Sequence, residues 1–162
     1  FRDALTEFKS IVSVPEGDLE RQYNKLNKAH KRSLAAAEDI SKRVDRVVSA
    51  SNRLLDEWRG ELDDYNDPAL RRLAEQQFDE TRQQASRLIA SMRETEQRMQ
   101  PVLASFQDQV LYLKHNLNFS AMAALEGEAA TIETNVDLLI AEMNRAIAEA
   151  DSFIAVMLES DS

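Results

Sequence analysis

Two histidines and a short run of aspartates are the residues of this chain whose types suit metal binding. A di-iron helical bundle needs Glu-x-x-His pairs, and neither His30 nor His115 has a glutamate three residues before it. The aspartates in residues 63–67 lack the glycine and the distal glutamate of a calcium-binding loop. We therefore expect no metal ion and no other cofactor, and we interpret these aspartates as turn and capping residues.

Nucleophilic catalysis would require a hydroxyl or thiol beside a histidine and an acid. Ser33 lies one helical turn after His30, a spacing that is common by chance, and the chain has no Cys. The three glycines are isolated, so no phosphate-binding loop is present in the sequence. We therefore expect no enzyme. A ligand carrier or enzyme with a polar site near His30 or His115 stays open as an alternative.

Composition narrows the fold class. The 162 residues include only 3 Gly, 3 Pro and 0 Cys, which excludes disulfide scaffolds and folds built from many turns. The hydrophobic share of 43% is ordinary for a folded domain and argues against disorder. A protein of long helices remains.

Residues 19–58 carry the strongest pattern in the sequence, a heptad repeat of core positions. One row recurs every seven residues from Leu19 to Leu54, and a second row recurs in the same way from Tyr23 to Trp58. A neighbouring row that includes Leu34 and Leu62 widens the apolar stripe, which favours a helix that touches two others.

Helix-breaking residues divide the rest of the chain. Pro15 and Gly17 separate a short amphipathic segment from the heptads, and Asp67 with Pro68 starts another long helix. Pro101 lies within that helix, and because the apolar phase survives across it we expect a continuous but kinked helix. We expect one domain, 1–162, with helices at about 1–13, 18–66, 68–117 and 120–159, and a turn near residues 118–120.

These elements predict an all-α protein. Long helices joined by tight turns pack as antiparallel neighbours. We expect an elongated antiparallel three-helix bundle, a spectrin-like or coiled-coil rod, with a short extra N-terminal helix. Counting from each turn, residue n of one helix should lie near residue 134 − n of the next, and near 237 − n around the second turn.

The net charge of −9 is unevenly distributed. Residues 119–162 carry nine acidic groups against one basic group, Arg145, whereas residues 21–32 hold five basic groups and no acid. By the register above, we expect this basic run to face Glu126, Glu128 and Glu133 within the fold. The candidate interaction surface consists of Arg21, Lys25, Lys28, Lys31, Arg32, Lys114, His115 and Asn116. The last three also suit a helix C-terminal cap.

Several segments together resemble a known family. They include Gly17–Glu20, Tyr23–Asn27, Leu55–Trp58 and, most specifically, Met99 to Asn118. This pattern is similar to a proteobacterial family of small helical proteins of unknown function, whose members often have an N-terminal signal or lipoprotein segment. The resemblance implies a bacterial protein in the periplasm or cell envelope, but no activity and no functional residues.

The sequence therefore predicts a non-enzymatic structural or protein-interaction bundle, and more specifically a periplasmic or membrane-tethered scaffold. We expect an unidentified protein partner, no nucleic acid, and a membrane association only through a possible upstream anchor. A cytoplasmic, nucleic-acid-associated coiled-coil accessory factor is the alternative that would use residues 21–32. We expect a monomer, because each apolar stripe can be satisfied within one chain, with a homodimer as the alternative.

Overall fold

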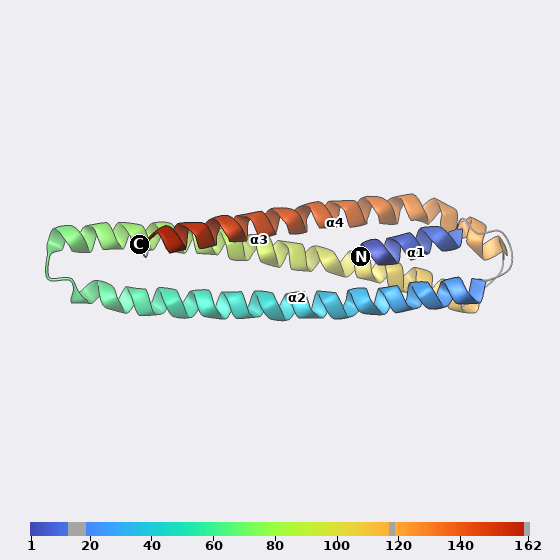
Figure 1. Ribbon diagram of the computed structural model, residues 1–162, viewed down its shortest axis with the longest axis horizontal. Coiled ribbons are helices and arrows are strands. Elements are labelled where there is room, and N and C mark those ends of the chain that lie inside the picture. The colour runs from blue at the N-terminus through green and yellow to red at the C-terminus, as the bar shows by residue number, and fades with distance from the viewer. Residues whose placement is uncertain (13–18, 117–118, 161–162) are drawn as a thin grey trace. The chain divides into compact units, whose positions relative to one another are not determined.

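The computed structural model describes residues 1–12, 19–116 and 119–160, and these residues form an all-α protein (Figure 1). The helices are α1 (Arg2–Val12), α2 (Leu19–Glu61), α3 (Pro68–His115) and α4 (Phe119–Ser160), with a 3-10 turn at Leu62–Asp64 after α2. The predicted all-α class and the short first helix are confirmed. The break expected at Pro15 and Gly17 lies outside the described residues.

Local sequence explains the turn between α2 and α3. The Asp67 carboxylate caps α3, since its Oδ1 accepts a hydrogen bond from the Ala69 backbone N–H at 2.7 Å. The helix expected at about 18–66 is α-helical to Glu61 and continues as the 3-10 turn at Leu62–Asp64. Glu61, Asp63 and Asp64 place negative charge at the negative end of the helix dipole, and Gly60 adds a helix-breaking residue there.

Two other predicted features concern α3 and the start of α4. As predicted, α3 continues through Pro101, and the Ser105 hydroxyl donates to the Pro101 carbonyl at 3.0 Å. The turn predicted at residues 118–120 was wrong for its last two residues, because α4 already begins at Phe119. Asn118 lies outside the described residues. No helix in the described part of the chain is both long and apolar enough to span a membrane.

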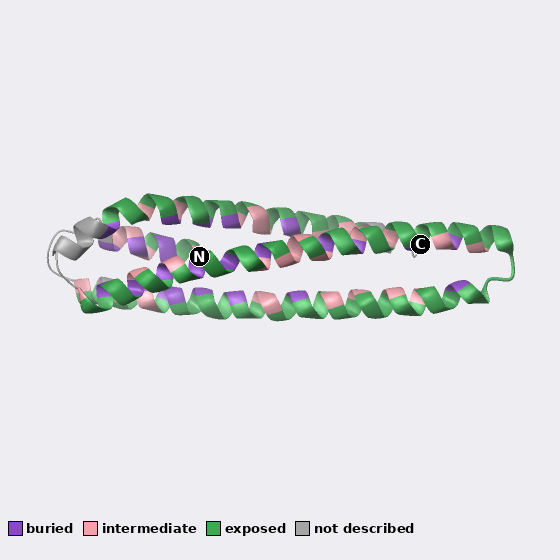
Figure 2. Ribbon diagram, turned by 180° about the vertical axis from the view of Figure 1, so that it is seen from behind, coloured by how far each residue is buried: buried purple, intermediate pink, exposed green. Residues whose placement is uncertain are grey.

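Contacts between helices divide the chain into two compact units. Unit 1 consists of Phe1–Ile40 and Thr95–Glu142, and it contains α1 together with parts of the three long helices. α1 completes its core, because Ala4, Phe8 and Ile11 are almost fully buried. Figure 2 shows buried residues along the inward faces of these helices. Other fully enclosed side chains of unit 1 are Leu26, Met99, Phe106, Leu113 and Val136.

Unit 2 consists of Ser41–Glu94 and Met143–Ser162, and it contains the α2–α3 hairpin and the last part of α4. Leu62, Ala74 and Phe78 form a buried cluster near the hairpin turn, and Leu55 and Trp58 pack against it. The Trp58 and Phe78 rings meet edge to face, with their centroids 5.7 Å apart. This pair lies within two residues of the predicted register, which the Arg71–Asp63 ion pair matches as well.

Candidate functional site

His30 lies in the core of unit 1. Its side chain is only 3% exposed, and its Nε2 donates a hydrogen bond to the Leu103 carbonyl of α3 at 3.3 Å. The heptad position predicted a partly buried residue, and the structure buries it more fully. Ser33, one turn later, is buried as well, and among the described residues no hydrogen bond joins the two side chains. The arrangement is that of a packed core histidine.

Burial of the imidazole penalises its charged form and lowers the pKa of His30, and the hydrogen bond to Leu103 offsets part of that effect. The unfolded chain therefore binds this proton more readily than the folded protein. Consequently, the His30 contribution to stability is complete above about pH 6.5 and is lost as pH falls below that value.

We expect urea unfolding to show this dependence between pH 7.5 and pH 5 as a difference between wild type and His30→Gln. Subtracting the unfolding free energies of the two proteins at each pH cancels the contributions of carboxylates, because both proteins contain the same carboxylates. His115→Gln is the matched control, because the His115 side chain is exposed. Parallel pH profiles for wild type and His30→Gln would contradict the prediction.

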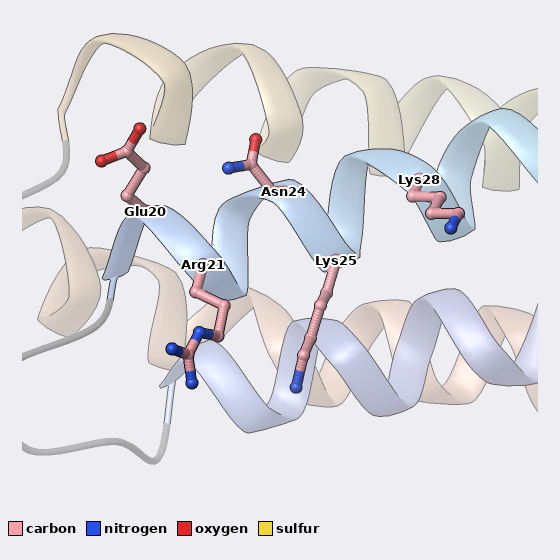
Figure 3. Close-up of a pocket in the computed structure, with 5 residues that line it drawn as sticks. All are labelled: Glu20, Arg21, Asn24, Lys25 and Lys28. Carbon is pink, nitrogen blue, oxygen red and sulfur yellow. The ribbon is translucent and has the colours of Figure 1, made fainter.

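The predicted basic run forms an exposed row on the first turns of α2. Arg21, Lys25, Lys28 and Arg32 follow one another at steps of four, three and four residues, so they share one face of the helix. Lys31 lies next to this row, and all five side chains are exposed. We call these five residues the basic stripe. A shallow hollow of ≈ 400 Å³ lies over its first half. Figure 3 shows Arg21 and Lys25 extending from one side of α2, opposite Glu20 and Asn24.

The expected acidic counterpart of the basic stripe does not pair with it. Glu133 forms an ion pair with Lys9 of α1 instead. Within the part of the chain that the structure describes, four members of the stripe take part in no ion pair: Lys25, Lys28, Lys31 and Arg32. The register between the long helices did not predict this, because α1 also packs into unit 1 and brings its own cation, Lys9, to α4. The stripe therefore keeps most of its charge available.

The other predicted surface residues lie at the C-terminal end of α3. Lys114 and His115 are exposed in its last turn, where positive charge complements the helix dipole. The Asn116 side-chain amide donates to the Tyr112 carbonyl at 3.0 Å. This hydrogen bond satisfies an end carbonyl, so the capping interpretation is confirmed for Asn116. His115 follows Leu103 by twelve residues, about 18 Å along a helix, so the two histidines do not share a site.

One carboxylate of unit 1 is partly withdrawn from water. The Glu142 side chain is 17% exposed, and its Oε1 pairs with the Arg98 guanidinium. Its Oε2 is buried without a hydrogen-bond partner in the described structure. The pair joins α3 to α4, and a half-buried pair of this kind orients its helices more than it stabilises them. The described residues contain no group of three potential metal ligands.

Sequence comparison supplies a family for this fold. The model of the family described as "Protein of unknown function (DUF2959)" matches residues 1–157. The chain belongs to this family. No curated protein matches it, and no solved structure does. The DUF2959 match agrees with the resemblance drawn from the residues, and it brings no activity to any side chain.

A second surface of this DUF2959 protein was not singled out in the sequence. In unit 2, α2, α3 and α4 enclose an apolar groove of ≈ 290 Å³, lined in part by Leu55, Ala85 and Phe153. Leu54 of α2 and Ile154 of α4 also line it and are 44% and 54% exposed. Both residues belong to apolar stripes predicted from sequence. A stripe alone does not show which of its residues lie at the exposed edge of the groove.

Proposed function

We propose that this protein is a non-enzymatic helical module that binds an acidic surface of another protein through the basic stripe. The supporting observation is the row of exposed cations on α2, most of which form no ion pair in the described structure. Successive members of the row are about 5–6 Å apart, a spacing that suits carboxylates on a partner helix. Such pairs contribute modestly to affinity and strongly to orientation and association rate.

A protein partner suits this surface better than a nucleic acid does. The chain carries a net charge of −9, so a polyphosphate would be repelled by most of the molecule. Glu20 lines the same hollow as Arg21, which gives the site a hydrogen-bond acceptor that a phosphate backbone does not use. We place the module in the periplasm or cell envelope of a bacterium, a proposal that is supported by the resemblance of its sequence segments.

The test is affinity capture from envelope and cytosolic extracts of the source cells with three baits. They are wild type, Lys25→Gln with Lys28→Gln, and the control Arg72→Gln with Arg87→Gln. The control removes two exposed arginines of α3 that form no ion pair among the described residues. At roughly 50 mM salt, wild type and control should retain the same proteins, and the lysine variant should lose them.

Identical captured proteins for all three baits would contradict the proposal. A stripe-dependent, salt-sensitive shift of DNA or RNA in a gel, with no stripe-dependent protein, would replace it with the nucleic-acid alternative. Capture of the proteins mainly from the cytosolic extract would contradict the envelope location and leave the binding surface in place.

A further inference from the structure

The apolar groove of unit 2 is bordered by two matching rows of aliphatic side chains. Val47 and Leu54 are seven residues apart on α2, and Ile147 and Ile154 are seven residues apart on α4. Leu54 and Ile154 line the same groove, which places the two rows at one level. All four side chains are exposed, by 37%, 44%, 57% and 54% in the order named.

An exposed helix face usually carries polar side chains, whereas these two rows are aliphatic. Residues seven apart fall almost on one side of a helix, and this spacing is the seam of a left-handed coiled coil. The rows lie beside the side chains that pack within unit 2, such as Val44 and Ala146, which are buried. Large aliphatic residues that are grouped at a groove belong to an interaction surface more often than to a solvated face.

Charges at the outer edges of the two rows are of opposite sign. On α2, Arg46 and Arg53 share a shallow hollow with Ala50, which also lines the apolar groove. Asp45 lines this hollow as well, but its carboxylate pairs with Arg93 of α3. On α4, the exposed Asp151 lies between the two isoleucines. The α2 border is therefore basic and the α4 border is acidic. The surface is thus complementary to a second copy of itself when α2 of one molecule meets α4 of the other.

We propose that a second copy of this chain covers the groove, in a dimer whose two-fold axis runs parallel to the helices of unit 2. Because α2 and α4 run in the same direction (Figure 1), this axis places the α2 row of each copy against the α4 row of the other. Val47 then meets the partner's Ile147, and Leu54 meets the partner's Ile154. The axis also pairs Arg53 with the partner's Asp151. The monomer expected from sequence assumed that every apolar row is covered within one chain.

The first test is the mass of the full chain in solution by sedimentation equilibrium. Wild type should approach twice the chain mass of 18.4 kDa as its concentration rises. Leu54→Glu with Ile154→Glu should remain at the monomer mass over the same range, with unchanged helix content by circular dichroism. Leu138→Glu is the control, because Leu138 is 57% exposed on α4 of unit 1 and does not line the groove. It should dimerise like wild type.

A crosslinking test reports which rows meet. The chain has no Cys, so introduced thiols are unambiguous. Chains with Leu54→Cys mixed with chains with Ile154→Cys should form the mixed disulfide in preference to either symmetric one. A wild type that stays monomeric at every concentration would overturn the proposal and leave the groove to a different protein. A dimer that the glutamate variant retains, or that forms mainly symmetric disulfides, would overturn it as well.

Discussion

Replacing Phe8 with alanine should detach α1 and lower the free energy of unfolding by about 3–5 kcal/mol. The Phe8 side chain is fully buried in unit 1, and it is the largest side chain of α1 among those whose burial the structure describes. α1 has 11 residues, and a helix of this length is marginal in water without tertiary contacts. Its order therefore depends on the apolar side chains that it inserts between the long helices.

Two measurements check this prediction. Chemical denaturation gives the change in unfolding free energy, and hydrogen exchange gives the protection of the α1 amides. Thr6→Ala is the control on the same helix, because Thr6 is exposed and its hydroxyl donates to the Arg2 carbonyl within α1. The control should stay within about 0.5 kcal/mol of wild type. A similarly small change for Phe8→Ala, with α1 still protected, would contradict the prediction.

Phe78→Ala should have an effect of similar size in unit 2, also about 3–5 kcal/mol. Phe78 is buried between the Trp58 ring and the Arg59 guanidinium, whose central carbon lies 5.6 Å from the ring centroid. The substitution removes both the buried volume and the edge-to-face contact, which itself contributes roughly 0.5–1.5 kcal/mol. Amide protection should therefore fall first in the α2–α3 hairpin.

Phe78→Leu is the matched control because it keeps most of the buried volume and removes the aromatic geometry. It should cost less than about 1.5 kcal/mol. Urea unfolding of the three proteins measures both values. A loss below about 1 kcal/mol for Phe78→Ala would show that the cluster near the turn is not a packed core.

The helices could be predicted from sequence because the residues that start them act on neighbouring backbone groups. Asp67 and Pro68 start α3 by supplying a capping carboxylate and a residue that needs no backbone donor. The end of α2 was less predictable because it depends on a balance. Gly60 and the acidic residues after it weaken the last turn, and only a 3-10 turn at Leu62–Asp64 survives there.

Burial could be predicted only in part, because a heptad row does not stay on one face of a straight helix. An α-helix has 3.6 residues per turn, so a strict seven-residue row drifts by about 20° per repeat. One row is buried at Leu26 and Ser33 and exposed at Val47 and Leu54. The neighbouring row moves the other way, from the exposed Leu34 to the buried Leu62.

The sequence predicted where the surface charges lie, but it did not predict which of them form ion pairs. The basic stripe is where helical spacing places it, and its members are exposed as a polar face requires. Their partners depend on which helix lies beside which, and that depends on the docking of α1. Lys9 and Glu133 are 124 residues apart in the chain, and no local pattern joins them.

The same separation has a consequence for synthesis. A contact can form only after both of its residues have left the ribosome, which adds about 5–20 residues per second. The Trp58–Phe78 contact of unit 2 closes a loop of twenty residues and is available early. α1 is made before the three long helices, yet its ion-pair partner on α4 is made more than a hundred residues later. The Lys9–Glu133 ion pair can therefore form only after most of the chain has been made.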